Sequence, residues 1–297
     1  MIDENKVCAV VVTYNRNEKL KKCLDSLVNQ KDAECAIYVV DNANSIETKN
    51  IAGAYDWDIA YLGLTKNIGT AGGFGLGIRE AINHGYKYIW LMDDDVYPSE
   101  KALYELLNAN KELGENWGCL SSVAYWTDGK LSKANIQKRG IFSFINEKDL
   151  LSDYIEVKMV SYASMFIRSD VVVDVGLPVS QYFIFTDDYE FSYRISLKYP
   201  VYVVTKSHVC HDRNLNEKTN IINDTTEKCS LYKYLYRNDI SFYRHFGVKG
   251  TIYLLLKNFY TILRLLFSND KSKKDKINTI IIGVKDGLKF TPGIDKM

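Results

Sequence analysis

The sequence predicts an α/β fold, with a mostly parallel central sheet whose two faces are covered by helices. Short β-rich apolar runs alternate with segments in which apolar residues recur at helical spacing. Polar and acidic residues follow several of these runs directly, at the sheet edge where open α/β proteins bind their ligands. A length of 297 residues suffices for one large domain and a smaller appendage.

The first half of the chain supplies the parallel part of this sheet. A strand is expected at Val7–Val12, and the helix after it places Leu20, Cys23, Leu24 and Leu27 on one face. A glycine-rich segment then opens a helix that runs to about His84. Three further strands are expected in this half, at 36–40, 59–62 and 88–92.

The second half begins with Pro98-Ser99-Glu100, which predicts the entry to a helix that ends near Leu113, with Ser99 as its N-cap. Residues 125–155 show no clear pattern. Later elements are expected as a strand at 157–167, a helix at 188–198 and a strand at 201–205. From about residue 227 the chain is aromatic and helical, so we expect a main domain over 1–226 and a helical region over 227–297.

Composition restricts the class of protein. The 38 Lys and Arg against 37 Asp and Glu leave a net charge of +1, which argues against a nucleic-acid binder. Six scattered cysteines without a C-x-x-C pair indicate reduced thiols, and the N-terminus lacks the pattern of a signal peptide. Lys257 and Arg264 interrupt the longest apolar run before it reaches the ~20 residues of a membrane span. We expect a cytoplasmic protein.

Three consecutive acidic residues, Asp93, Asp94 and Asp95, follow the strand expected at 88–92. Adjacent carboxylates repel one another, so a cation or hydrogen-bond donors must offset their charge. Mg²⁺ or Mn²⁺ binds carboxylate oxygens together with substrate phosphates, and would neutralise the diphosphate of a sugar nucleotide. Asp93 and Asp95 project to the same side if the chain stays extended there. A solvated acidic turn or a helix N-terminal cluster explains the triplet equally well.

A second acidic group lies within Phe185–Phe191, just before an expected helix. One of its carboxylates can serve as a general base, because sugar transfer with inversion requires a group that takes the proton of the attacking hydroxyl. The ordinary alternative is that Asp187 or Asp188 caps the helix that starts near Tyr189. Considered alone, capping is the better interpretation.

The glycine-rich segment 67–77 and two histidines are further candidates. Glycines permit close backbone approach and a helix N-terminus attracts anions, so the segment resembles a phosphate-binding loop, with close helix-to-sheet packing as the alternative. It matches neither the dinucleotide fingerprint nor the P-loop. His208 and His211 follow the last expected strand, and an imidazole can complete a metal site begun by the aspartates. We assign His84 and His245 to the surface or the core.

Together these segments resemble family 2 glycosyltransferases with the GT-A fold, from Val7 to about Phe246. VVVTYNR at 10–16 and VVDN at 39–42 match the nucleotide-binding half of that family. NIGTAGGF at 67–74, followed by WLMDDDV at 90–96, is similar to the galactofuranosyltransferase and rhamnosyltransferase branch. The resemblance implies an inverting, metal-dependent transferase that moves a sugar from a nucleotide-sugar donor to a cell-surface polysaccharide or lipid-linked glycan, with residues 1–226 as its catalytic domain.

The resemblance also implies a role for each candidate residue. Asp93, Asp95 and His211 would hold Mn²⁺ or Mg²⁺, with His211 favoured over His208 by an alignment without gaps from Tyr199. Ten residues would bind the donor, and Thr13 and Asp41 would contact its base and ribose. The ten are Thr13, Asn15, Arg16, Asp41, Asn67, Gly69, Gly72, Gly73, Asp93 and Asp94.

On the acceptor side, the resemblance implies that Asp188 is the catalytic base and that Asp187 and Glu190 lie near the acceptor. Thr186 stands where the branch usually has a tryptophan, so the acceptor preference stays open. Tyr236-Arg237-Asn238 resembles a segment common near the end of such enzymes, for which we expect a structural role or acceptor contacts. Galactofuranose or rhamnose is the favoured sugar, and a UDP-sugar is favoured over a dTDP-sugar. The compact chain favours addition of single residues over polymerisation.

The segment Thr251–Ser268 is apolar and aromatic, and a lysine cluster at 271–274 follows it. It can lie on the inner membrane surface near a lipid-linked acceptor, which would make the protein peripheral at the cytoplasmic face. Alternatively it packs on the catalytic domain or on a second subunit of a homo-oligomer. Both interpretations stay open.

Two other functions compete with this interpretation. A sugar nucleotidyltransferase shares the scaffold and paired aspartates, but the basic glycine-rich signature near its N-terminus is missing here. A non-catalytic scaffold that only binds nucleotide sugars is ranked below both, because the candidate base and metal ligands are all present.

Overall fold

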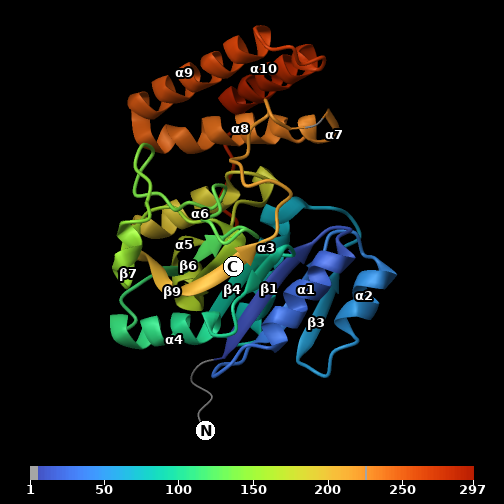
Figure 1. Ribbon diagram of the computed structural model, residues 1–297, viewed down its shortest axis with the longest axis vertical. Coiled ribbons are helices and arrows are strands. Elements are labelled where there is room, and N and C mark those ends of the chain that lie inside the picture. The colour runs from blue at the N-terminus through green and yellow to red at the C-terminus, as the bar shows by residue number, and fades with distance from the viewer. Residues whose placement is uncertain (1–5, 225) are drawn as a thin grey trace. The chain divides into compact units, whose positions relative to one another are not determined.

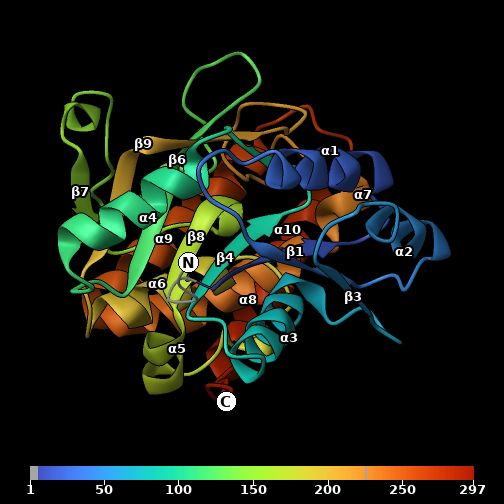
Figure 2. The same cartoon turned by 90° about the horizontal axis from the view of Figure 1, so that it is seen from below.

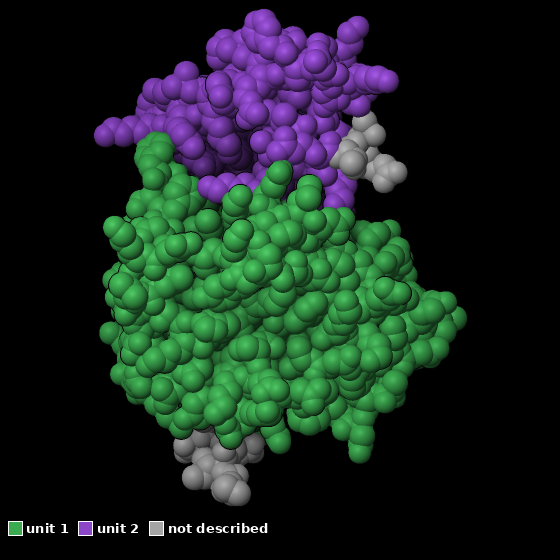
Figure 3. Space-filling model, viewed as in Figure 1, with its two compact units in different colours: residues 1–180, 188–217, 294–297 green, residues 181–187, 218–293 purple. Residues whose placement is uncertain are grey.

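The computed structural model describes residues 6–224 and 226–297, which form two compact units (Figures 1 and 3). Unit 1 comprises the described residues up to Ser180 together with 188–217 and 294–297. Unit 2 comprises 181–187 and 218–293. The sequence placed a boundary near residue 226, whereas unit 2 begins at Lys218 and also includes the short segment before Asp188.

Unit 1 contains one sheet with nine strands among the described residues. The strands are β1 (Val7–Thr13), β2 (Ala36–Asp41), β3 (Ile59–Gly63), β4 (Tyr88–Asp93), β5 (Val96–Pro98), β6 (Cys119–Tyr125), β7 (Tyr154–Val157), β8 (Met165–Arg168) and β9 (Val201–His211). Their order is β3-β2-β1-β4-β8-β6-β9-β5, and β7 pairs with β9. The first four strands in this order are parallel, and β8, β5 and β7 are antiparallel to their neighbours.

Helices cover both faces of the sheet (Figure 2). They are α1 (Asn17–Val28), α2 (Ile46–Ala52), α3 (Gly69–Asn83), α4 (Ala102–Leu113), α5 (Ser169–Val175) and α6 (Asp187–Ser196). Strand β1 shows why both layers are needed, since every residue in it is buried. Val7, Ala9 and Val11 share a core with α1, α2 and α4, and the alternate residues Val10 and Val12 share a second core with α3, α5 and α6. The predicted α/β class is therefore confirmed.

Two local predictions are wrong. The strand expected at 157–167 is split, because β7 ends at Val157, β8 begins at Met165, and the amide of Val160 between them donates to Ser192 Oγ (3.1 Å). Ser99 is not the side-chain cap of α4, which begins at Ala102. The amide of Leu103 in its first turn donates instead to the side chain of Gln30 (2.9 Å), a cap that local sequence cannot reveal.

Unit 2 is helical and has a small core of its own. Its helices are α7 (Thr226–Cys229), α8 (Tyr232–Tyr243), α9 (Gly247–Leu266) and α10 (Lys273–Lys289). Gly283 and Gly287 let α10 pack closely on α8, because a Cβ added at either would lie 2.7 Å from a side-chain carbon of Tyr236 or Ile240. Within the described residues, no helix has the length and apolar content that crossing a membrane requires.

Candidate active site

The acidic triplet lies at the carboxyl ends of the central strands. Asp93 is the last residue of β4 and pairs with Val12 of β1, so the turn after β4 lies beside the end of β1. The hydroxyl of Thr13, the last residue of β1, donates to Asp94 Oδ2 (2.7 Å). The expected clustering at this edge follows from the parallel order of the two strands.

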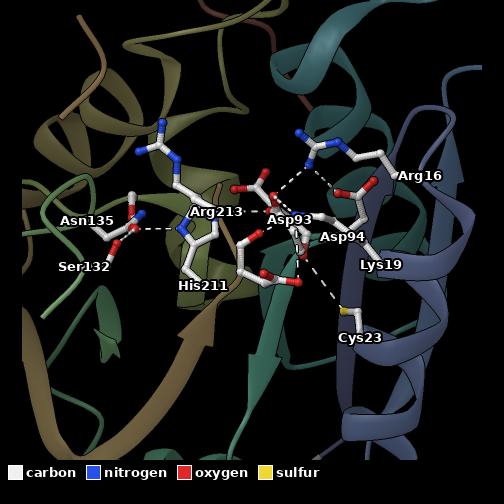
Figure 4. Close-up of polar contacts among 12 residues, drawn as sticks. Arg16, Lys19, Cys23, Asp93, Asp94, Ser132, Asn135, His211 and Arg213 are labelled. Carbon is white, nitrogen blue, oxygen red and sulfur yellow. Dashed lines mark hydrogen bonds and ion pairs between the residues drawn. The ribbon is translucent and has the colours of Figure 1, made fainter. Parts of the chain in front are cut away.

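The register of the antiparallel pair β5–β9 brings His211 to this triplet. Val96, which follows Asp95 directly, is paired with His211, and the histidine Nε2 lies 3.1 Å from Asp95 Oδ1. Figure 4 shows His211 between Asn135 and the triplet residues Asp93 and Asp94. One ligand atom from each of Asp93, Asp95 and His211 lies within 4.8 Å of the other two. His208 is exposed, and its Nε2 contacts the carbonyl of Thr205 (2.8 Å), so it is not part of this group.

A polar network fixes the orientation of the His211 ring. Its Nδ1 lies 2.7 Å from Asn135 Oδ1, which also accepts a hydrogen bond from Ser132 Oγ (2.7 Å). The amide nitrogen of Asn135 donates to Ser161 Oγ (2.8 Å), so its oxygen faces the histidine. Because Nδ1 is directed to Asn135, Nε2 is the nitrogen that faces Asp95, and it would offer its lone pair to a bound metal in place of this carboxylate contact. Two carboxylates and this imidazole fit Mn²⁺ or Mg²⁺.

Two basic side chains from the start of α1 lie against the carboxylates. Arg16 donates to Asp94 Oδ1 (2.9 Å) and Asp95 Oδ2 (2.8 Å). Lys19 Nζ lies 3.7 Å from Asp95 Oδ2 and donates to the carbonyl of Asp212. These cations partly offset the repulsion within the triplet.

The pKa values of the three carboxyls differ because their surroundings differ. Burial, reinforced by the negative charge of Asp95, raises the pKa of Asp93 to about 7. Burial also raises the pKa of Asp94, although Arg16 opposes this shift. Burial alone would raise the pKa of Asp95, but the hydrogen bond and charge of His211, together with Arg16, bring it below its ordinary value. The site therefore contains carboxylates that an additional cation would stabilise.

A hollow of about 390 Å³ lies at the carboxyl ends of β1, β2 and β3. It is lined by Tyr14, Asn15, Asn42, Ala43, Asn44, Leu64, Thr65, Lys66 and Asn67. Asn15 and Asn67 were expected to bind the donor, whereas Tyr14, Asn44 and Lys66 were missed, although their positions just after strand ends were a usable signal. A larger hollow of about 510 Å³ beside α1 and β5 contains none of the expected residues.

Thr13 and Asp41 precede residues that line this hollow but do not line it themselves. Asp41 is fully buried, and its carboxylate accepts hydrogen bonds from the amides of Ala43 (2.8 Å) and Ser45 (2.7 Å) and from the hydroxyl of Tyr61 (2.9 Å). Asp41 thereby fixes the loop that lines the hollow. The hydroxyl of Thr13 is likewise occupied by Asp94. In this structure both side chains are engaged in hydrogen bonds within the protein.

The glycines at the start of α3 serve close packing. An added Cβ at Gly72 would lie 2.9 Å from the side chain of Ile68, and one at Gly73 would lie 2.9 Å from Val12 of β1. Gly69 has a positive φ of 75°, and its amide donates to Asn67 Oδ1 (2.8 Å). The packing interpretation of this segment therefore applies to Gly72 and Gly73, and Gly69 forms the turn that carries Asn67.

Asp188 lies in the first turn of α6 and is partly exposed. Ser192 holds this turn in place, because its hydroxyl donates to the carbonyl of Asp188 (2.7 Å) and accepts from the amide of Val160 (3.1 Å). Asp187 is buried. The backbone position of the expected base is thus fixed by side-chain hydrogen bonds from within unit 1.

Glu190 has a structural partner. Its two oxygens accept hydrogen bonds from Arg194 Nε (2.8 Å) and NH2 (2.9 Å), and both side chains are nearly buried. Arg194 also donates to the carbonyls of Val175 (2.6 Å) and Leu177 (2.9 Å) after α5. In this structure the carboxylate of Glu190 is paired with Arg194, which joins α6 to the end of α5, and a place for Glu190 on the acceptor side stays a prediction.

Within unit 2, the side chain of Asn238 contacts the loop that leads to Asp187. Its buried amide nitrogen lies within hydrogen-bond distance of the carbonyls of Tyr182 (2.9 Å), Ile184 (2.9 Å) and Phe185 (2.8 Å). Phe183, Phe185 and Thr186 of this loop have positive φ values of 66°, 69° and 67°, which are unfavourable for such residues. Of the two expectations for the segment 236–238, these contacts correspond to the structural role.

Sequence comparisons identify the family to which the chain belongs. A family model described as glycosyl transferase family 2 matches residues 8–176, more than half of the chain. Galactofuranosyltransferase GlfT1 of Mycolicibacterium smegmatis is 40% identical over 101 residues, 34% of this chain and 33% of that protein. GlfT1 of Mycobacterium tuberculosis is 29% identical over 198 residues, 64% of each protein. The chain thus matches less than two thirds of the length of these relatives.

Structural comparison gives the same fold. Staphylococcus aureus TarS matches 96% of this chain and 44% of its own, with a TM-score of 0.56 and 14% identity. Its form 1–349 in complex with UDP-GlcNAc matches 96% of this chain and 73% of its own, with a TM-score of 0.52 and 14% identity. At this identity the likeness establishes the fold, including the helical extension after the sheet domain.

Proposed function

Because the chain belongs to glycosyl transferase family 2, we propose that it moves a sugar, with inversion, from a nucleotide-sugar donor to a glycan or lipid-linked acceptor. It is a glycosyltransferase with the GT-A type of fold expected from the sequence. The observation that carries the proposal is the convergence of Asp93, Asp95 and His211 beside the asparagine-lined hollow.

The hollow suits the nucleoside part of the donor. Asn15, Asn44 and Asn67 offer amide donors and acceptors, which match the edge of a base and the hydroxyls of a ribose. Tyr14 is 51% exposed and offers a ring face on which a base can stack. A uridine nucleotide is favoured over a thymidine nucleotide because TarS, which shares the fold, has been solved with UDP-GlcNAc.

The metal site suits the diphosphate. Asp93, Asp95 and His211 would hold Mn²⁺ or Mg²⁺, which neutralises charge on the departing diphosphate when bound. Arg16 and Lys19 contribute further positive charge at the same edge and can exchange their carboxylate partners for phosphate oxygens. Asn135 keeps His211 Nε2 available for this purpose.

Asp188 is the proposed base. Its carboxylate takes the proton of the acceptor hydroxyl as that oxygen forms a bond to the anomeric carbon and the bond to the diphosphate breaks. Ser192 fixes the turn from which it acts. No covalent bond between sugar and enzyme forms in such a single displacement.

Galactofuranose is the favoured sugar, because GlfT1 from two organisms is named as a galactofuranosyltransferase. Rhamnose is the alternative within the same branch. N-acetylglucosamine is a third candidate, because the S. aureus poly(ribitol-phosphate) β-N-acetylglucosaminyltransferase TarP is 29% identical over 154 residues, 46% of each chain. An acceptor that is a cell-surface polysaccharide or its lipid-linked precursor would place the enzyme at the cytoplasmic face of the membrane.

The first test is donor binding by calorimetry with the full chain, using UDP- and dTDP-sugars with and without Mn²⁺. One donor should bind in a metal-dependent manner, and Asp95→Ala should lose this response. Product analysis with that donor and a competent acceptor then separates the candidate functions. Release of a nucleoside diphosphate supports glycosyl transfer, release of pyrophosphate supports a nucleotidyltransferase, and binding without any glycoside product supports a scaffold.

A further inference from the structure

Helix α9 of unit 2 is apolar on two opposite sides. Leu254 and Leu265 are fully buried, and Leu265 belongs to the core of unit 2. The opposite side is exposed and carries a second set of large apolar residues, which we name the outer face of α9. Its members, each between 47% and 88% exposed, are Val248, Ile252, Leu255, Leu256 and Phe259 on α9, together with Phe267 directly after the last helical residue.

The spacing makes the outer face a continuous stripe. Val248, Ile252, Leu255 and Phe259 recur at intervals of four, three and four residues, which places them on one side of a helix of 20 residues, about 30 Å long. Single exposed apolar residues are ordinary on protein surfaces, whereas a contiguous stripe of large ones marks a surface that another apolar phase covers.

The distribution of charge in unit 2 indicates what kind of surface covers the stripe. Unit 2 has 14 Lys and Arg against 7 Asp and Glu, a net charge of +7, although the whole chain carries only +1. The rest of the chain therefore carries −6. Exposed lysines stand at both ends of the outer face, with Lys249 near its start and Lys271 and Lys274 beyond its end. An apolar stripe flanked by lysines complements a surface that is both apolar and negatively charged.

We propose that the outer face of α9 docks in the plane of an anionic phospholipid surface, with its side chains in the acyl region and the flanking lysines among phosphate headgroups. Such a surface supplies apolar contact and negative charge together. A second copy joined through the same face supplies only the apolar part, and it brings two units of net charge +7 together. The lipid surface is therefore the occupant that the charge distribution favours.

The test is co-sedimentation of the full chain with phosphatidylcholine vesicles, with and without phosphatidylglycerol. We expect binding that requires phosphatidylglycerol and weakens as salt rises. Phe259→Ser with Phe267→Ser should reduce binding at least tenfold. Lys271→Ala with Lys274→Ala should reduce it about 25-fold, at about fivefold per lysine. These lysines are exposed, so this pair keeps the test valid should the phenylalanine variant fold poorly.

The matched control is Leu151→Ser, which removes an apolar side chain that is 89% exposed but belongs to unit 1. It should bind vesicles as the wild type does. Equal loss in this control, or no preference for phosphatidylglycerol, overturns the proposal. A dimeric wild type in light scattering, together with a monomeric phenylalanine variant, would also overturn the proposal. The outer face would then be covered by a second copy of the chain. Vesicle binding needs no sugar donor, so its failure leaves the proposed transfer reaction untouched.

Discussion

His211 Nδ1 lies 2.7 Å from Asn135 Oδ1, and this contact determines which nitrogen of the ring is available for a metal. Asn135 is itself held by Ser132 and Ser161, so its amide oxygen cannot turn away without breaking two further hydrogen bonds. With Nδ1 engaged by Asn135, Nε2 is the nitrogen that faces Asp95 and that would bind a metal in place of this contact. The amide therefore orients a candidate metal ligand without being one itself.

Asn135→Leu should weaken Mn²⁺ binding about 10- to 100-fold, because the ring loses the partner that fixes its tautomer and orientation. Binding is measured by calorimetry with Mn²⁺ alone. Asn50→Ala, an exposed asparagine on α2, serves as the control and should bind Mn²⁺ like the wild type. Unchanged affinity in Asn135→Leu at normal thermal stability would show that His211 is not a ligand.

Removal of the metal should have the same effect as loss of Asp95. We expect EDTA to reduce transfer by the wild type about 100- to 1000-fold, a range typical for loss of one group that stabilises transition-state charge. Asp95→Asn keeps the shape of the side chain and should show a similar loss without EDTA. Since both changes remove one interaction, EDTA should reduce the activity of Asp95→Asn little further. Additive losses would mean that Asp95 acts independently of the metal.

Asp188→Asn should lower kcat about 100- to 10,000-fold, because an amide cannot take the proton of the acceptor hydroxyl. The affinity for the nucleoside diphosphate should stay unchanged, since the asparagine-lined hollow and the metal ligands are intact. Transfer kinetics and calorimetry with UDP and Mn²⁺ measure the two quantities separately. A variant that retains full kcat would assign the base to another residue.

Much of the parallel part of the sheet could be predicted because β1, β2 and β4 are buried on both faces. β1 to β4 read as uninterrupted apolar runs followed by polar residues, and their parallel order then places Thr13, Asp93 and Asp95 at one edge. Sequence alone could also reduce the candidate histidine ligands of the metal to two, His208 and His211. The choice depends on the β5–β9 register, in which Val96 lies opposite His211. That pairing joins residues more than 100 positions apart.

The two local predictions that failed, the cap of α4 and the strand at 157–167, depend on distant contacts. The side chain of Gln30 caps α4, and the hydroxyl of Ser192 accepts a hydrogen bond from the amide of Val160 between β7 and β8. The sequence predicts a donor contact for Asp41 because it follows a strand, and this contact stays a prediction. In the structure its carboxylate accepts from two nearby amides and from the hydroxyl of Tyr61 on β3. Glu190 has a partner four residues later, a spacing that the sequence does show and that indicated a helical ion pair.

Glu190→Gln should lower the free energy of unfolding by about 3 kcal/mol, because it removes one charge from a nearly buried pair and leaves Arg194 uncompensated. Denaturant unfolding monitored by circular dichroism measures the change. Asp174→Asn provides a control of the same chemistry, since its exposed pair with Lys198 should contribute less than about 1 kcal/mol. Equal effects in the two variants would mean that the Glu190 carboxylate is solvated in solution.

Asn238→Ala should lower kcat while leaving UDP affinity unchanged. The loop at 182–186 contains three residues with positive φ, so it keeps its shape only while Asn238 satisfies the buried carbonyls of Tyr182, Ile184 and Phe185. Relaxation of the loop would displace Asp188, which follows Asp187 directly, whereas no residue of this loop lines the asparagine-lined hollow proposed for the nucleoside.

Kinetics with saturating donor, combined with calorimetry for UDP, separates these effects. Asn238→Asp is the informative comparison, because aspartate has nearly the same shape but cannot donate a hydrogen bond to the three carbonyls. It should lose at least as much kcat as Asn238→Ala. If Asn238→Asp retains wild-type kcat, the amide donor does not hold the loop, and the strained conformation must be maintained by the packing of the loop on α8.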